Sequence, residues 1–322
     1  MSVILAIDGG GTHTRCVAIS LSGEVIGVGS GGASNHLLVD KALVRSSIED
    51  AIRMALSKAG MRTSDVECVS AGLAGVDFDG TGADEMEEIF REFGFGKILV
   101  SGDMVTAHAG ALGGRSGVLA LAGTGSSVLG IGDDGTRVKV GGWGPIFGDE
   151  GSGYGIGAAA LRAAARDFDG RGPKTELTTV IVNELRIRDF KDSIEAVYLD
   201  EMQPREIAEL SKTVYSVAKA GDEIALDILR TAGKELAECV TAAIRRMAST
   251  NGNIRVSYQG SVITSCDFMR ESFCRELCDA SPAASIIPPR FPPVVGAYLL
   301  GRTELGLSND EKLFSKLDES HK

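Results

Sequence analysis

The chain has 322 residues, of which 43% are hydrophobic and 24% charged, and it carries a net charge of −11. This length is typical of about two domains of roughly 150 residues each, and the ordinary composition excludes wholesale disorder. The acidic balance argues against a broad nucleic-acid surface, although backbone N–H groups can still hold an anionic ligand locally.

The sequence carries no pattern of membrane insertion or secretion. No uninterrupted apolar run reaches the ~18–20 residues that a membrane-spanning helix needs. The N-terminus lacks a basic flank and a cleavage site, so it predicts a strand rather than a signal peptide. The six cysteines form no CxxC pair, which is typical of reduced thiols. We therefore expect a cytoplasmic protein that binds neither membranes nor nucleic acid.

The first third of the chain alternates strand and helix patterns. Apolar residues at positions 44, 48, 52 and 56 predict a helix that ends at a glycine. Apolar and β-branched runs bounded by turn residues predict the strands. The predicted strands are Val3–Ile7, Arg15–Leu21, Glu24–Gly29, Val66–Leu73 and Lys97–Val100, and the predicted helices are Lys41–Gly60, Asp84–Phe93 and Asp103–Leu112.

The pattern then restarts, which suggests an ancient duplication. Three strands are predicted at Gly117–Ala122, Ser126–Ile131 and Arg137–Val140. A glycine-rich segment follows, and helical sequence then dominates to about Ala248. The later predicted elements are a strand at Ile254–Tyr258 and helices at Asp267–Cys278 and Pro292–Gly301. The polar tail Ser308–Lys322 is expected to fray.

Two short glycine loops occupy equivalent positions in the two halves. Asp8-Gly9-Gly10-Gly11-Thr12 separates the first two strands, and Gly123-Thr124-Gly125-Ser126 does so in the second half. Such loops can cradle phosphate oxygens with consecutive N–H groups, and an aspartate at the strand end can hold Mg²⁺ through water. A plain hairpin with a capping aspartate is the alternative. The repetition favours phosphate binding, although neither loop is a GxxxxGK[ST] P-loop.

Asp103 follows a strand and opens a helix. It is suited to capping that helix, which is the commoner role of an aspartate at this position. Open α/β sheets also place their chemistry at the carboxyl ends of strands, where a carboxylate can take a proton from a hydroxyl group. Both roles therefore stay open for Asp103.

The segment Gly141–Gly153 is the densest unusual stretch. Asp149 and Glu150 within it can bond sugar hydroxyls or cap the following helix. Trp143, the only tryptophan, is expected in the core rather than as a platform for a sugar.

Taken together, these motifs resemble the N-acetylglucosamine kinase-like sugar kinases of the BadF-type (BadF/BadG/BcrA/BcrD) ATPase family. That family belongs to the superfamily of actin, hexokinase and the seventy-kilodalton heat-shock chaperones. The resemblance spans about residues 4–301, and the GGWG…GDEGS block is its most specific part. The matching pieces are Ile7-Asp8-Gly9-Gly10-Gly11-Thr12, Ser34-Asn35-His36, Ser101-Gly102-Asp103, Gly123-Thr124-Gly125-Ser126, Gly141-Gly142-Trp143-Gly144, Gly148-Asp149-Glu150-Gly151-Ser152 and Gln259-Gly260-Ser261-Val262.

The resemblance implies an α/β fold of two ribonuclease-H-like domains with a cleft between them. Their predicted extents are residues 1–112, onto which a C-terminal helix at about 292–322 packs back, and 113–291. It also implies an ATP-dependent sugar kinase that uses Mg²⁺ and acts on a small-molecule sugar or sugar acid. A homodimer is a candidate oligomeric state.

The resemblance implies a role for each matching residue. Asp103 is the catalytic base, and Asp8 is the aspartate on the Mg²⁺ side, which holds the ion through water. The other implied contacts are Gly10, Gly11, Thr12, Gly123, Thr124 and Gly125 for the ATP phosphates, Gly260 and Ser261 for adenosine, and Asn35, His36, Ser127 and Asp149 for the sugar.

One departure from the family pattern concerns substrate choice. Family members that phosphorylate N-acetylglucosamine usually read Gly-Thr-Gly-Ser-Asn, whereas Ser127 stands at the position of that asparagine. We therefore expect N-acetylglucosamine to be a weaker substrate here, although a water can bridge the gap. Glucosamine, plain hexoses and 2-keto-3-deoxygluconate compete as substrates. For an acidic sugar, His36 is one candidate partner of the carboxylate.

Two other classes of function are alternatives to a sugar kinase. Some BadF-type relatives are ATP-driven iron–sulfur activators of 2-hydroxyacyl-CoA dehydratases, with a cysteine three residues before the Gly-Thr-Gly loop. Ala120 stands at that position here, and Cys274 and Cys278 are expected to be ordinary thiols. A non-enzymatic ATP-binding module, as in chaperone relatives, is the third alternative; no peptide-binding domain is expected after the kinase-like region.

Overall fold

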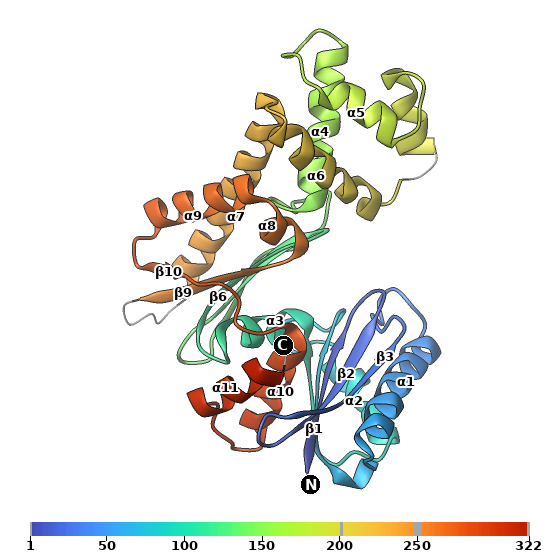
Figure 1. Ribbon diagram of the computed structural model, residues 1–322, viewed down its shortest axis with the longest axis vertical. Helices are drawn as coiled ribbons and strands as arrows, with labels where there is room; N and C mark the ends of the chain where they lie inside the picture. The colour runs from blue at the N-terminus through green and yellow to red at the C-terminus, as the bar shows by residue number, and fades with distance from the viewer. Residues whose placement is uncertain (1, 200–201, 248–252, 321–322) are drawn as a thin grey trace. The chain divides into compact units, whose positions relative to one another are not determined.

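The computed structural model describes residues 2–199, 202–247 and 253–320. Within it the chain divides into two compact units, Met1–Ser116 with Pro288–Lys322, and Gly117–Ile287. Each unit holds one five-stranded mixed sheet with helices packed against it (Figure 1). The predicted α/β fold of two ribonuclease-H-like domains is confirmed.

The first sheet has the strand order β3-β2-β1-β4-β5. β1 pairs antiparallel with β2, and β2 with β3, whereas β4 and β5 continue the sheet in parallel. The carboxyl ends of β1, β4 and β5 therefore meet at one edge. The elements of this unit are β1 (Val3–Gly9), β2 (Thr14–Ser20), β3 (Val25–Gly31), α1 (Lys41–Ala59), a short 3-10 turn (Thr63–Asp65), β4 (Val66–Leu73), α2 (Ala83–Glu92), β5 (Ile98–Gly102), α3 (Asp103–Leu112), α10 (Pro293–Glu304) and α11 (Glu311–Ser320).

Apolar side chains on both faces of β1 hold the first unit together. One core cluster joins alternate β1 residues to α1 and α2, and the other joins the opposite face of β1 to α10 and α11. α1 lies very close to β3, because a Cβ added at Gly29 would come within 2.0 Å of the Ala51 carbonyl oxygen. Glycine at this position therefore permits the close contact between helix and strand.

The prediction that the polar tail frays is wrong. α11 forms a helix whose side chains of Leu313, Phe314 and Leu317 are at most 5% exposed. These three positions share one helix face, and they complete the core cluster under α10. The last two residues of the predicted tail, 321 and 322, lie outside the described residues.

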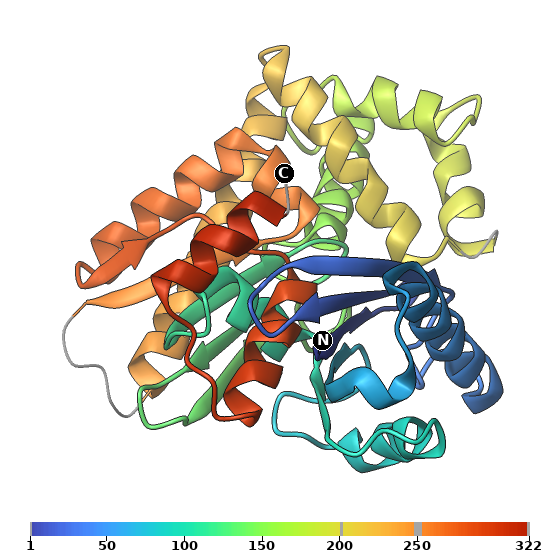
Figure 2. The same ribbon diagram turned by 60° about the horizontal axis from the view of Figure 1, so that its bottom comes forward.

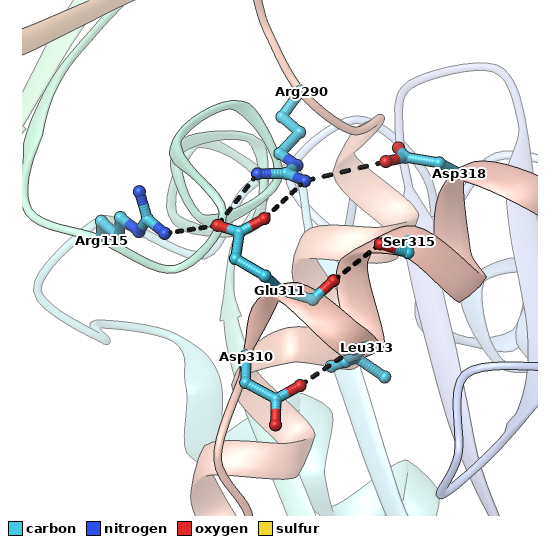
Figure 3. Close-up of polar contacts among 7 residues, drawn as sticks. All are labelled: Arg115, Arg290, Asp310, Glu311, Leu313, Ser315 and Asp318. Atoms are coloured by element: carbon cyan, nitrogen blue, oxygen red, sulfur yellow. Dashed lines mark hydrogen bonds and ion pairs between the residues drawn. The ribbon is translucent and has the colours of Figure 1, made fainter.

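α11 forms ion pairs with the two segments at which the chain passes between units, residues 115–116 and 288–290, called the crossing segments. The chain leaves the first unit after Ser116 and returns to it at Pro288. Glu311 of α11 binds the neighbouring Arg115 at 2.8 Å and Arg290 at 3.1 Å (Figure 3). The guanidinium of Arg290 also lies 4.4 Å from the ring centroid of Phe314. One carboxylate thus links both crossing segments to the C-terminal helix.

The second sheet repeats the topology of the first, with the order β10-β9-β6-β7-β8. β6, β7 and β8 are antiparallel neighbours, and β9 and β10 extend the sheet in parallel. The short β10 was not predicted. The elements of this unit are β6 (Gly117–Ala122), β7 (Ser126–Ile131), β8 (Arg137–Gly141), α4 (Gly153–Phe168), α5 (Leu177–Glu184), a 3-10 turn (Phe190–Asp192), a π-helical turn (Glu195–Leu199), α6 (Pro204–Lys219), α7 (Glu223–Arg246), β9 (Ile254–Gln259), α8 (Ser261–Ser265), α9 (Asp267–Ala280) and β10 (Ala284–Ile286).

The helices of the second unit form one continuous core with its sheet. α7 and α9 lie side by side, with Gly233 so close to α9 that an added Cβ would come within 2.3 Å of the Met269 carbonyl oxygen (Figures 1 and 2). The predicted helical region is confirmed up to Arg246, and Ala248 lies outside the described residues. Among the described residues, no helix is long and apolar enough to span a membrane.

Candidate active site

The first glycine loop is a tight turn between β1 and β2. Gly10 donates its N–H to the carbonyl oxygen of His13 at 2.9 Å, so the turn itself uses that donor. Gly11 and Thr12 are exposed, and the described part of the chain offers their N–H groups no recorded acceptor. The turn therefore presents two adjacent backbone donors to solvent, an arrangement suited to an anion.

Two carboxylates lie near this turn. Asp8 is the penultimate residue of β1, and Asp103 is the first residue of α3, directly after β5. Burial, followed by the nearby charge of Asp103, raises the pKa of Asp8 to about 6, while Arg15 acts in the opposite direction. Asp103 also accepts the N–H of Met104 at 2.8 Å, whereas the N-cap of α3 is Gly102 and no side chain caps the helix. The role of helix cap that the sequence offered for Asp103 is therefore wrong.

The segment Ser34-Asn35-His36 is held against the first turn. Ser34 donates its N–H to the carbonyl oxygen of Gly10 at 3.0 Å, and its hydroxyl accepts a hydrogen bond from Thr14 at 2.8 Å. Asn35 accepts the N–H of Leu37 with its Oδ1 atom at 3.0 Å. These contacts bring Asn35 to the same end of the sheet as Asp8 and Asp103.

Residues 74–82 form a loop that the sequence analysis did not single out. Gly75 has φ +98°, and a Cβ added there would lie 2.7 Å from Asn35 Oδ1 and 2.9 Å from His36 Nδ1. The imidazole of His36 therefore packs on this loop. A glycine two residues after a strand that ends at the sheet's carboxyl edge is the signal that could have identified the loop.

The second glycine loop is shorter than the first but is built similarly. Gly123 donates its N–H to the Gly125 carbonyl oxygen at 2.9 Å. The start of α4 fixes the loop, because Gly153 and Tyr154 donate their N–H groups to the carbonyl oxygens of Gly123 and Thr124 at 2.8 and 3.0 Å. The described residues again provide no recorded acceptor for the N–H groups of Thr124 and Gly125.

Asp149 lies directly against this second loop. Its carboxylate accepts the N–H of Ser126 at 3.3 Å, and a Cβ added at Gly125 would come within 3.1 Å of it. Burial raises the pKa of Asp149, the Ser126 N–H lowers it, and the charge of Glu150 raises it. Asp149 also has φ +64°, a left-handed conformation that costs energy for a residue with a Cβ. Such strain is common at functional positions.

Ser127 of β7 is paired with Gly141, the first residue of the GGWG segment, at the end of the neighbouring strand β8. A Cβ added at Gly142 would lie 2.7 Å from Ser127 Oγ, which is buried and has no recorded partner among the described residues. The prediction that Trp143 lies in the core is wrong, because its side chain is 75% exposed. Its neighbours Ile146 and Phe147 are also exposed, at 90% and 82%.

Gly260 and Ser261 follow β9 beside the second loop. Gly260 has φ +107°, and an added Cβ would lie 2.2 Å from the carbonyl oxygen of Ala122, so this turn requires glycine. Ser261 contributes to the wall of a pocket of about 130 Å³, which Lys212 and Tyr215 of α6 also line. Neither of these two α6 residues was predicted from the sequence. The three-residue spacing of Lys212 and Tyr215 places both on one face of α6, but a helical spacing does not indicate that this face contacts α8.

The profile of the BadF/BadG/BcrA/BcrD ATPase family matches residues 5–301 of the sequence. The chain belongs to this ATPase family. The resemblance inferred from the glycine loops and the GGWG…GDEGS block is thereby confirmed.

The relatives of this ATPase-family chain include sugar kinases. It is 32% identical to an N-acetylmuramic acid/N-acetylglucosamine kinase of Clostridium acetobutylicum, over 94% of this chain and 99% of that protein. It is 28% identical to an N-acetyl-D-glucosamine kinase of Dictyostelium discoideum, over 92% and 97%. The solved structure of a provisionally named N-acetylglucosamine kinase from Chromobacterium violaceum is 25% identical, with a TM-score of 0.73 over 93% and 98% of the two chains.

The six cysteines form no disulfide, and each lies in the described part of the chain. Ala120, at the position of the cluster cysteine in the dehydratase activators, is fully buried in β6. Burial raises the pKa of the Cys274 thiol, as the neighbouring Cys278 also does. A raised pKa lowers the fraction of reactive thiolate at Cys274.

Proposed function

We propose that this protein is an ATP-dependent kinase that transfers the γ-phosphoryl group to a hydroxyl of an amino sugar. The observation that carries the proposal is the pair Asp8 and Asp103, which lies beside a glycine turn with two outward N–H groups. A phosphoryl-transfer site needs this combination of a carboxylate near the accepting hydroxyl and donors near the phosphate.

In this proposal Asp103 accepts the proton of the sugar hydroxyl. A positioned base of this kind contributes about 10²–10⁴-fold to a reaction rate. The Met104 N–H binds one carboxylate oxygen at 2.8 Å and so fixes the orientation of this carboxylate. Asn35, beside the same turn, would orient the sugar by its amide.

The residues of the first unit fit a bound Mg²⁺. The charge of Asp103 is one cause that raises the pKa of Asp8, and a divalent cation relieves such repulsion. Asp8 would hold the ion through water, since Mg²⁺ keeps several of its waters. When bound there, Mg²⁺ neutralises charge on the phosphate oxygens of ATP.

We assign the ATP phosphates to backbone donors of the two glycine loops. In the first turn we assign this role to Gly11 and Thr12, with Gly10 shaping the turn. In the second loop we assign it to Thr124 and Gly125, with Gly123 as the shaping residue. Gly260 and Ser261, with the pocket lined by Tyr215, would receive the adenosine.

The sugar-side residues of the second unit would be Asp149 and Ser127. The buried Asp149 carboxylate is fixed by the Ser126 N–H, and so can accept hydrogen bonds from sugar hydroxyls. The named relatives act on N-acetylmuramic acid or N-acetylglucosamine, so amino sugars with an N-acetyl group head the substrate list. His36 remains a candidate partner for the carboxylate of an acidic sugar.

A coupled assay of ADP release tests the function. The panel should contain N-acetylglucosamine, N-acetylmuramic acid, glucosamine, glucose and 2-keto-3-deoxygluconate, each with ATP and Mg²⁺. We expect sugar-dependent ADP release with at least one amino sugar, and ³¹P NMR of the product would identify the phosphorylated hydroxyl. If no sugar raises ADP release above that of Asp103→Asn, the proposed function is wrong.

Two further parts of the proposal concern the protein in the cell. We expect a cytoplasmic enzyme, because its substrates ATP and amino sugars meet there, and we expect it to work as a homodimer. Sedimentation velocity at micromolar concentration would separate a dimer from a monomer.

A further inference from the structure

We propose that His36 is a positioning residue, which acts through the loop of residues 74–82 to hold both Asn35 and Asp103 in place. This loop is called the Gly75 loop below. The inference rests on the proposed kinase function for its kinetic consequence, but its structural part can be tested without a substrate.

The Gly75 loop packs against the imidazole of His36 with its first and last glycines, Gly75 and Gly82. Gly75, with φ +98°, has no Cβ, and one added there would lie 2.9 Å from both Nδ1 and Cε1 of the ring and 2.7 Å from Asn35 Oδ1. On the other side of the loop, a Cβ at Gly82 would lie 3.5 Å from His36 Nε2. The ring therefore lies against two glycines of one loop and fixes their separation.

Directly after Gly75, the same loop reaches the residue before Asp103. A Cβ added at Gly102 would lie 2.6 Å from the carbonyl oxygen of Val76 and 3.2 Å from that of Asp77. Gly102 is the N-cap of α3, and Asp103 is the first residue of that helix. A displacement of the loop therefore moves the backbone that carries the proposed base.

The Gly75 loop can transmit such a displacement because it is internally bonded. Asp77 donates its N–H to Thr81 at 3.0 Å, and Gly80 donates to Asp77 at 3.1 Å. Ala74 donates to the carbonyl oxygen of Gly9 at 2.8 Å, which ties the loop to the first glycine turn as well. The loop thus contacts the segments that carry Asp8, Asn35 and Asp103.

The packing of His36 has a cost that the fold alone does not explain. Its Nδ1 atom is buried, and no hydrogen-bond partner is recorded for it among the described residues. A buried polar atom without a partner is destabilising, so the Nδ1 atom does not hold the ring in place. The contacts with Gly75 and Gly82 do so by packing.

Gly75→Ala tests the contact, and Gly80→Ala is its matched control. Gly80 belongs to the same loop and has nearly the same backbone angle, φ +95°, but nothing lies within 4 Å of an added Cβ. Both substitutions therefore place a Cβ at nearly the same positive φ, and only Gly75→Ala also pushes on Asn35 and His36. We expect similar melting temperatures, with kcat/KM for the sugar about 10–100-fold lower in Gly75→Ala than in Gly80→Ala.

A readout without substrate separates this inference from the kinase function. Met104 donates its N–H to Asp103, so its amide resonance reports the position of that carboxylate. We expect this ¹H–¹⁵N resonance to move in Gly75→Ala and in His36→Ala, and to stay in place in Gly80→Ala. An unmoved resonance in both Gly75→Ala and His36→Ala would overturn the positioning role, whether or not a sugar is phosphorylated.

His36 variants then distinguish positioning from direct contact with substrate. Positioning predicts that His36→Ala lowers kcat and raises KM by the same factors for N-acetylglucosamine and for N-acetylmuramic acid, and that His36→Gln restores part of the loss. A loss confined to the acidic sugar would identify His36 as a direct partner of its carboxylate and refute the inference. Wild-type kinetics in His36→Ala would refute it as well.

Discussion

Asp103 lies within electrostatic range of Asp8, and after burial its charge is the second cause that raises the pKa of Asp8 to about 6. The two residues come from the ends of two strands of one sheet, β1 and β5, which are separated in that sheet by β4. Their proximity is therefore a product of strand order. The charge of Asp103 thus adds to the larger effect of burial on the pKa of Asp8.

The first prediction concerns the pH dependence of stability in the metal-free protein. An unfolded aspartate titrates near pH ~3.9, whereas Asp8 titrates at about 6 in the folded chain. Between these values the folded state binds more protons, so the contribution of Asp8 to the free energy of unfolding falls as the pH rises. Urea unfolding at pH 4.5 and pH 7 should show that Asp8→Asn removes this decrease.

The control for that experiment is Asp134→Asn. Asp134 is exposed, and the N–H and side chain of Thr136 lower its pKa, so its contribution has the opposite sign. If Asp8→Asn leaves the pH dependence unchanged, Asp8 titrates like an exposed aspartate.

The second prediction concerns the proposed base. Asp103→Asn should lower kcat by about 10²–10⁴-fold, because an amide cannot accept the sugar proton. The fold should be retained, since the amide oxygen can still accept the Met104 N–H. Isothermal titration should show nearly unchanged ATP binding. A variant with turnover close to that of the wild type would remove Asp103 from the mechanism.

The third prediction concerns Ser127 and the choice of sugar. Ser127 Oγ has no recorded partner in the described chain, so Ser127→Ala should change stability little. Ser127→Asn adds an amide that can both donate and accept, and should raise kcat/KM for N-acetylglucosamine about tenfold, the value of one buried hydrogen bond. The proposed reading of this position fails if N-acetylglucosamine is already the best substrate and Ser127→Asn does not improve it.

The fourth prediction concerns the link between α11 and the crossing segments. Glu311→Gln removes the charge that binds both Arg115 and Arg290, and should lower the free energy of unfolding by about 1 kcal/mol or less. The loss should shrink at high salt, because the side chains are largely exposed. Chemical unfolding at 20 mM and 500 mM NaCl would measure it.

Asp318→Asn is the matched control on the same helix. Asp318 lies 3.7 Å from Arg290 (Figure 3). Among the described residues it forms no recorded ion pair with Arg115, which Glu311 does. The same change of charge should therefore cost less than in Glu311→Gln. Equal losses would mean that only the net charge of α11 matters.

Much of the local structure followed from the sequence. Apolar runs bounded by glycine predicted strands such as Val66–Leu73 and Ser126–Ile131 with the bounds that the structure has. The aspartate after a strand predicted the start of α3 at Asp103. The glycine loops and the GGWG…GDEGS block identified the family, because a motif with close spacing is written in consecutive residues.

Only the tertiary structure decided how distant segments meet. The tail looked polar, yet three of its side chains complete the core under α10, and Trp143 looked apolar, yet it is exposed. The Gly75 loop connects Asn35 with Gly102, and Tyr215 of α6 lines a pocket together with Ser261 of α8. Local sequence patterns record which face of an element is apolar, whereas the partner of that face depends on the strand order and helix packing of the whole unit. For this reason the sequence determined the elements and the chemical groups of the site, and the fold determined which of those groups act together.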